Sequence, residues 1–176
     1  MAVNRLCLGA LQGRFLLKIE QIPGGRVIIV DERMLEWIAQ RIPAMGPGYE
    51  WQMASAIGLG HKGKIIAGMA VHNYLPHYRS CELTFASDTP IWATKISMRA
   101  MLAYPFEQLG VRRIMTVIAE SNVRAIRVNE HLGFKLEGRC RYGCGNEDAL
   151  IFGLLKEETP DWMGFASDEK PAITGT

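Results

Sequence analysis

The chain has 176 residues, of which 48% are hydrophobic and 22% charged, and its formal net charge at pH 7 is +2. This length supports one domain with a full hydrophobic core and is short for two. The composition excludes wholesale disorder, and the small net charge gives no indication of nucleic-acid or membrane binding. Apolar stretches stay below the roughly 20 residues that a membrane-spanning helix needs. We therefore expect a globular protein without a membrane span.

Cysteine usage gives a first indication of the compartment. The chain has four cysteines, Cys7, Cys81, Cys140 and Cys144, and no Cys-x-x-Cys pair. Cys140 and Cys144 together with a distant histidine still lack a fourth zinc ligand. An apolar run near the N-terminus is broken by glycine and polar residues, which argues against a signal peptide. We expect reduced thiols, no bound metal and a cytoplasmic protein.

The N-terminal part predicts a strand and a helix. A turn at Gly24-Gly25 precedes the apolar run over residues 26–30, which is typical of a buried strand. Asp31 is suited to cap a helix over residues 32–41, because the apolar residues of that stretch fall on one helical face. Pro43 then ends the helix.

The middle of the chain predicts three strands and a second helix. Residues 51–60 and 64–75 are strand-like and flank a polar turn, so they predict a hairpin. Residues 81–87 alternate apolar and polar side chains as a strand does. A helix is expected over residues 94–109, with its last turns loosened by Pro105.

A central strand and a third helix come next. Residues 112–120 form a nearly continuous apolar, β-branched run, which is typical of a strand buried on both faces. The following helix over residues 123–132 has Ser121 or Asn122 as its N-terminal cap and ends before Gly133.

The C-terminal part predicts two closing strands, over residues 134–143 and 147–158. From Thr159 onward the chain turns polar, so we expect a domain over residues 1–158 and a tail with little structure over 159–176. The order of elements predicts the α+β class: one domain with a mixed, mostly antiparallel central sheet, flanked by helices on both faces.

One motif in the second half resembles a known family. The pattern Asn122-x-x-Ala125, then Leu132-Gly133-Phe134 and then Glu137-Gly138, resembles the second cofactor-binding segment of the GNAT superfamily of N-acetyltransferases. The resemblance extends over residues 15–157 in the order of elements and over 80–157 in motifs. It implies a GNAT-like fold and acetyl-CoA as co-substrate.

The end of the chain narrows the resemblance. Arg139 after Glu137-Gly138, and Asp148 before the last apolar strand, look like the branch that acetylates the N-termini of ribosomal proteins. The resemblance implies an amine-bearing acceptor, on a protein or a small molecule, and a homodimer, with no metal. Neither a nucleic acid nor a membrane is expected as a partner.

The family fold places acetyl-CoA between two strands that part from one another. Their free backbone amides would pair with the pantetheine arm, and a helix start would receive the pyrophosphate. Here the strands would be Leu83–Ser87 and Met115–Ala119, with the helix beginning near Trp92–Lys95. The candidate cofactor-binding residues are Phe85, Ala86, Ser87, Trp92, Ala93, Thr94, Lys95, Asn122, Ala125 and Arg127. Further cations expected near the phosphates are Arg99 and Arg124.

The stretch before that helix departs from the family pattern. Relatives carry glycines there, whereas residues 87–97 contain none and include Pro90 and Trp92. Weakened or lost cofactor binding is therefore an alternative, in which Trp92 fills the cofactor slot of a non-enzymatic binding module. A further alternative is the modification of nucleic-acid bases, for which Arg139, Arg141 and Tyr142 form a candidate contact cluster.

Acyl transfer to an amine needs a group that takes the ammonium proton and a donor to the departing thiolate. Glu82 stands where many relatives keep a catalytic glutamate, and Ser121 and Tyr142 are the candidate donors. Ala125 and Asn129 stand where relatives often place a serine and a tyrosine. The histidines His72, His77 and His131 are alternative bases near neutral pH, and no spacing singles one out.

Overall fold

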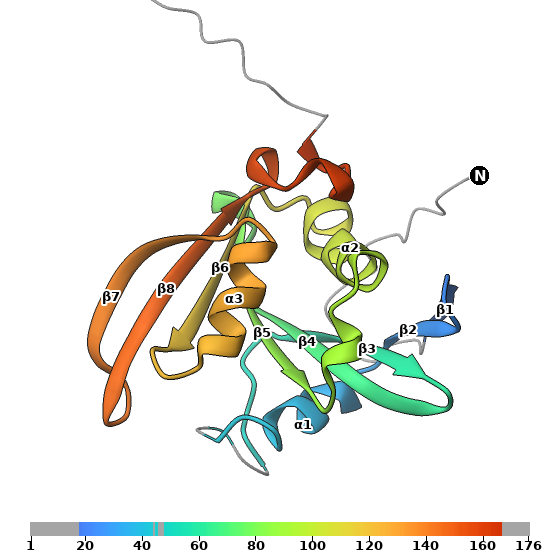
Figure 1. The fold of residues 1–176 in the computed structure, drawn as a ribbon, viewed down its shortest axis with the longest axis horizontal. Helices are drawn as coiled ribbons and strands as arrows, with labels where there is room; N and C mark the ends of the chain where they lie inside the picture. Colours follow the sequence, from blue (N-terminus) through green and yellow to red (C-terminus); the bar gives the residue numbers. More distant parts are fainter. Residues whose placement is uncertain (1–17, 44, 46–47, 167–176) are drawn as a thin grey trace, which may run out of the picture.

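The computed structural model describes residues 18–43, 45 and 48–166. Its centre is one eight-stranded sheet in the order β1-β2-β3-β4-β5-β6-β8-β7 (Figure 1). The strands are β1 (Lys18–Ile22), β2 (Arg26–Val30), β3 (Ser55–His61), β4 (Lys64–Leu75), β5 (Ser80–Ser87), β6 (Arg113–Ala119), β7 (Lys135–Cys144) and β8 (Glu147–Leu155). The helices are α1 (Arg33–Ala39), α2 (Lys95–Ala103) and α3 (Val123–His131).

Neighbouring strands of the sheet are antiparallel, except for the parallel pair β5 and β6. The α+β class with a mixed, mostly antiparallel sheet is thereby confirmed. The strands and helices predicted from periodicity and turn residues are present with bounds that shift by a few residues. The pattern did not give the bounds of β1, which forms an edge of the sheet beside β2.

One face of the β3–β4–β5 part of the sheet is covered by α1. Met34 and Ile38 of this helix are buried against small residues of the strands. A Cβ atom on Gly58 would lie 2.8 Å from the Met34 sulfur, and one on Gly68 would lie 2.7 Å from Cγ1 of Ile38. These glycines therefore let the short helix approach the sheet closely. Asp31 accepts the backbone N–H of Arg33 at 2.9 Å and so satisfies a donor of the first turn.

The opposite face is covered by α2 and α3, which bury the larger hydrophobic core (Figure 1). Met101, Leu102 and Phe106 supply large side chains to this core with at most 1% exposure. Beyond Ala103 the helix continues as a π-helical turn over Tyr104–Gln108, which contains Pro105. The predicted loosening of the helix at this proline is confirmed, because proline offers no N–H for the regular ladder.

Part of the expected tail is folded, which corrects the prediction from the sequence. Met163 and Phe165 are buried, and the Phe165 ring lies 5.2 Å from that of Phe106. Trp162 lies under the Lys95 ammonium at 5.6 Å. Three apolar side chains scattered among proline and glycine show no periodicity, but the end of α2 gives them a surface on which to pack. Residues 167–176 lie outside the described residues.

No helix in the described ranges is long and apolar enough to cross a membrane. The β7–β8 hairpin forms the other edge of the sheet, and most of its β7 residues are exposed. Ion pairs attach this hairpin to the rest of the sheet. Glu137 pairs with Arg113 on β6, and Arg139 pairs at 2.6 Å with Glu120, which directly follows β6. A second pair of Arg139, with Asp148 on β8 at 2.6 Å, lies within the hairpin itself.

Candidate active site

The site begins where β5 and β6 separate. The two strands pair only over Ser80–Glu82 and Arg113–Met115. Beyond these pairs β5 remains bonded to β4 as far as Ser87, and β6 remains bonded to β8 as far as Ala119. The predicted parting of the two strands is confirmed. We call this point, defined by Glu82 and Met115 as the last pair, the fork.

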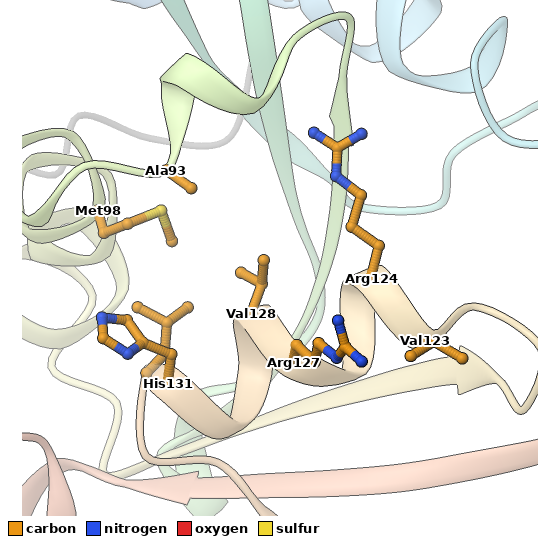
Figure 2. A pocket seen from close by; sticks show the side chains of 8 residues that line it. Ala93, Met98, Val123, Arg124, Arg127, Val128 and His131 are labelled. Atoms are coloured by element: carbon orange, nitrogen blue, oxygen red, sulfur yellow. The ribbon is translucent and has the colours of Figure 1, made fainter.

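A pocket of about 490 Å³ lies on the α2–α3 side of the fork. In Figure 2, α3 forms one wall and the segment carrying Ala93 and Met98 forms the other. The lining residues are Ala93, Met98, Val123, Arg124, Arg127, Val128, His131 and Leu132. Of the predicted cofactor-binding residues, Ala93 and Arg127 line this pocket.

The polar groups of the pocket come from α3. Arg124, Arg127 and His131 follow one another at helical spacing and all line it (Figure 2). Within the described part of the chain, neither Arg124 nor Arg127 has a carboxylate partner. Other arginines do pair with carboxylates: Arg33, Arg41, Arg99, Arg112, Arg113 and Arg139. Two guanidinium groups that no described carboxylate pairs with make the pocket suited to an anion.

The turn before α2 uses its own backbone donors. The N–H of Ala93 donates to the Pro90 carbonyl at 3.3 Å, and that of Thr94 donates to the Trp92 carbonyl at 2.8 Å. The Thr94 hydroxyl caps the helix by accepting the Ser97 N–H at 3.3 Å. These two amides are therefore already bonded within the turn, and Ala93 and Thr94 stay predictions as cofactor-binding residues. Among the described residues, the N–H groups left without a partner at this helix start are those of Lys95 and Ile96.

Trp92 packs into the core. It is 6% exposed, and its ring lies 5.7 Å from that of Phe85 on β5. It does not belong to the pocket lining, so it leaves the pocket open. Ala86, also a predicted cofactor contact, is buried against α1 on the other face of the sheet. Ser87 is the last β5 residue paired with β4.

Asn122 caps α3. Its side-chain oxygen accepts the Ala125 backbone N–H at 3.1 Å, which accounts for the asparagine of the motif. Asn129 is buried and joins the helix to β6, because its oxygen accepts the Thr116 hydroxyl at 2.9 Å. Its amide nitrogen donates to the Ala125 carbonyl at 3.0 Å. Asn129 thus fixes the position of α3 beside the fork.

The predicted catalytic residues are not brought together. Glu82 lies at the fork, where its carboxylate accepts the Asn73 amide at 2.9 Å. Ser121 is exposed in the turn before α3, and its backbone N–H donates to Glu147 at 2.8 Å. Tyr142 is 76% exposed on β7, which β8 separates from β6. Its backbone N–H donates to Asp148 at 2.9 Å.

The cluster proposed for nucleic-acid contact is partly neutralised. Arg139 lies between the Glu120 and Asp148 carboxylates. The hydrogen bond from Arg139 holds the pKa of the Asp148 carboxyl below its ordinary value. Arg141 and Tyr142 are exposed beside this pair. A salt-bridged arginine offers little charge to a phosphate, so the structure does not favour this function.

His72 is the residue near the fork that the sequence could not single out. It lies on β4 directly opposite Glu82 in the strand register. Its Nε2 atom is 2.9 Å from the Thr84 hydroxyl, and the Trp51 ring lies 5.4 Å from the imidazole. Burial lowers the pKa of His72 below its ordinary value of 6.5, while the Glu82 charge acts in the opposite direction.

Known proteins of similar sequence and fold are acetyltransferases by name. The chain is 27% identical over 120 residues to the protein named putative ribosomal N-acetyltransferase YdaF of Bacillus subtilis. That match covers 61% of this chain and 61% of the relative's length. The chain therefore spans less than two thirds of this curated relative.

Two solved structures share the fold. A protein described as a putative acetyltransferase has a TM-score of 0.65 at 17% identity, covering 88% of this chain and 94% of its own. The spermidine/spermine N-acetyltransferase SpeG of Vibrio cholerae has a TM-score of 0.62 at 14% identity, covering 74% and 94%. Residues 25–135, more than half of the chain, match the family described as the acetyltransferase (GNAT) domain, and the chain belongs to this family.

Proposed function

We propose that the protein is an N-acetyltransferase that transfers the acetyl group of acetyl-CoA to a primary amine. The observation that carries this proposal is the fork between β5 and β6 with a cationic pocket on one side of it. The fork offers strand edges to an extended pantetheine arm, and the pocket offers guanidinium groups to phosphates. Membership of the GNAT family supports the same conclusion.

Acetyl-CoA is a co-substrate that the available residues fit. Arg124, Arg127 and His131 line the pocket and would hold the phosphates. The unbonded N–H groups of Lys95 and Ile96 would add to this end of the site. The thioester would lie toward the fork. We keep Asn122 as a residue of the cofactor side through its cap of α3.

The chemistry is a direct attack. The amine nitrogen forms a bond to the acetyl carbonyl carbon, and the bond from that carbon to sulfur breaks with the electron pair leaving on sulfur. The ammonium substrate must first lose a proton, and the thiolate must gain one. Glu82 supplies negative charge at the fork, which attracts an ammonium. Ser121 and Tyr142 stay predictions for proton donation to sulfur.

The acceptor reaches the fork from the α1 side. Glu82 and its neighbour Thr84 belong to the β5 face that α1 partly covers, whereas the cationic pocket lies on the α2–α3 side. Donor and acceptor would then meet through the opening between the strands. We propose a primary amine on a protein or a small molecule as acceptor, a homodimer as the working assembly and the cytoplasm as the compartment.

Thermal unfolding with acetyl-CoA tests the proposal. Binding to the native state stabilises it by RT ln(1 + [L]/Kd), or about 2.7 kcal/mol at 100 times Kd. We expect the melting temperature to rise by several degrees, and less so for Asn122→Ala. A melting temperature unchanged up to millimolar acetyl-CoA would contradict cofactor binding. Thiol release with a panel of amines then tests turnover.

A further inference from the structure

A cluster of polar and aromatic side chains lies beside the fork on the α1 side. His72 on β4 contacts the Thr84 hydroxyl at 2.9 Å and stands opposite Glu82 in the register. Trp51 packs its ring edge-on against the imidazole at 5.4 Å, and Tyr49 packs on Trp51 at 5.2 Å. His72 is thus half-buried between β5, which carries Glu82, and the ring of Trp51.

The other histidines of the chain lie elsewhere. His61 contacts the Gly25 carbonyl at the far end of β3, and His77 is exposed in the 3-10 turn before β5. His131 lines the pocket on the α2–α3 side. His72 is therefore the imidazole adjacent to the fork on the side from which the acceptor approaches.

We propose that His72 takes the proton from the acceptor ammonium. This inference rests on the proposed function and adds a residue to it. The ammonium transfers one proton to the imidazole, and the nitrogen lone pair that this exposes attacks the acetyl carbonyl carbon. The carbon–sulfur bond breaks, the attacking nitrogen releases its second proton, the thiolate takes up one proton, and the proton on His72 leaves to solvent. The sum is ammonium plus thioester giving amide, thiol and one proton.

The surroundings suit this role. Burial keeps the imidazole neutral near pH 7, so its lone pair is available. Glu82 is the charged group that acts on it, and its carboxylate stabilises the imidazolium once the proton has arrived. His72 Nε2 is within hydrogen-bond distance of the Thr84 hydroxyl. In the tautomer that carries its hydrogen on Nε2, the Nδ1 atom is free to accept the proton. Trp51 restricts water on one side of the ring.

The pH profile of turnover tests the proposal. His72→Gln keeps an amide in reach of Thr84 and loses the base. We expect kcat to fall about 100-fold, the lower end of the usual effect of a general base. The acidic limb of the kcat/KM profile should disappear, and the Kd for acetyl-CoA should stay within twofold. The matched control, His77→Gln, should keep the wild-type profile.

A spectroscopic titration gives a second measurement that needs no turnover. We expect the His72 imidazole to titrate below 6.5, and to titrate lower still in Glu82→Gln, because the carboxylate raises its pKa. Either of two results overturns the role of His72: an unchanged pH profile in His72→Gln, or a His72 pKa that does not change in Glu82→Gln. Failure of the wild-type protein to bind acetyl-CoA instead overturns the proposed function, and the two outcomes are distinguishable.

Discussion

Two helices begin beside the fork, and the groups presented at their first turns differ. Before α2, the turn from Pro90 bonds its own amides, and Thr94 caps the helix. Before α3, Asn122 caps the helix, and the following turns present two arginines to a pocket, neither paired with a carboxylate of residues 18–43, 45 and 48–166. We propose that the anion-binding end of this site uses side chains of α3 in place of backbone donors at the start of α2.

The largest effect should follow from removing the side-chain half of this comparison. In Arg124→Ala/Arg127→Ala, two charge-assisted hydrogen bonds of about 1.5–3 kcal/mol each are lost. We expect the Kd for acetyl-CoA to rise roughly 100-fold or more. Isothermal titration calorimetry measures it. Arg141→Ala is the matched control, since this arginine is exposed on β7 away from the pocket. Equal losses in both proteins would show that the pocket does not bind the phosphates.

A smaller effect is expected where α3 is attached to β6. In Asn129→Ala the Thr116 hydroxyl loses its partner in a buried setting, and the Ala125 carbonyl loses a part-buried bond. Leaving such a group unsatisfied costs about 1–3 kcal/mol of unfolding free energy. Urea unfolding checks the value. A change below about 0.5 kcal/mol would mean that Asn129 is not the attachment of α3.

Removing either helix cap should lower the unfolding free energy by nearly the same amount. Thr94→Ala and Asn122→Ala each remove a side-chain acceptor at a helix start, for which the usual cost is about 1 kcal/mol. Thermal unfolding of both variants in the absence of acetyl-CoA measures this cost. The two helix starts differ in function if added acetyl-CoA returns the melting temperature of Thr94→Ala to the wild-type value and does not do so for Asn122→Ala. Equal restoration would remove the distinction between the two helix starts.

The smallest effect is expected for Lys95→Pro. Lys95 is the first residue of α2, where proline fits, and the extended backbone of Thr94 suits a following proline. The variant removes one of the two unbonded N–H groups. With the phosphates held by α3, the Kd for acetyl-CoA should change less than twofold relative to Lys95→Ala. A tenfold loss of affinity for acetyl-CoA would show that the start of α2 binds the phosphates.

The fold was predictable because its signals are local. The apolar run of β6, the glycine-bounded hairpin of β3 and β4, and the position of Pro105 each determine structure within a few residues. The parting of β5 and β6 followed from the family resemblance. The packing of Trp162 and Met163 was missed, because it depends on the surface of α2, far away in the sequence.

The site was less predictable, because its contacts depend on register and dihedral angles. A β-bulge between His72 and Leu75 and a 3-10 turn over Pro76–Tyr78 decide which β4 residue faces Glu82. The alternation of residues alone leaves that offset open. The bonds that occupy the Ala93 and Thr94 amides arise from a 3-10 turn, which proline favours but does not fully specify.

The short pairing of β5 with β6 has a consequence for hydrogen exchange. Past Glu82 and Met115, each strand keeps an antiparallel ladder with its outer neighbour alone. Backbone amides in such a strand point alternately to either side, so every second one faces the opening. Those amides should exchange with deuterium faster than their neighbours. A pantetheine arm lying in the opening would slow exchange at alternate positions. Protection of every second amide would therefore mark the path of the arm along both strands.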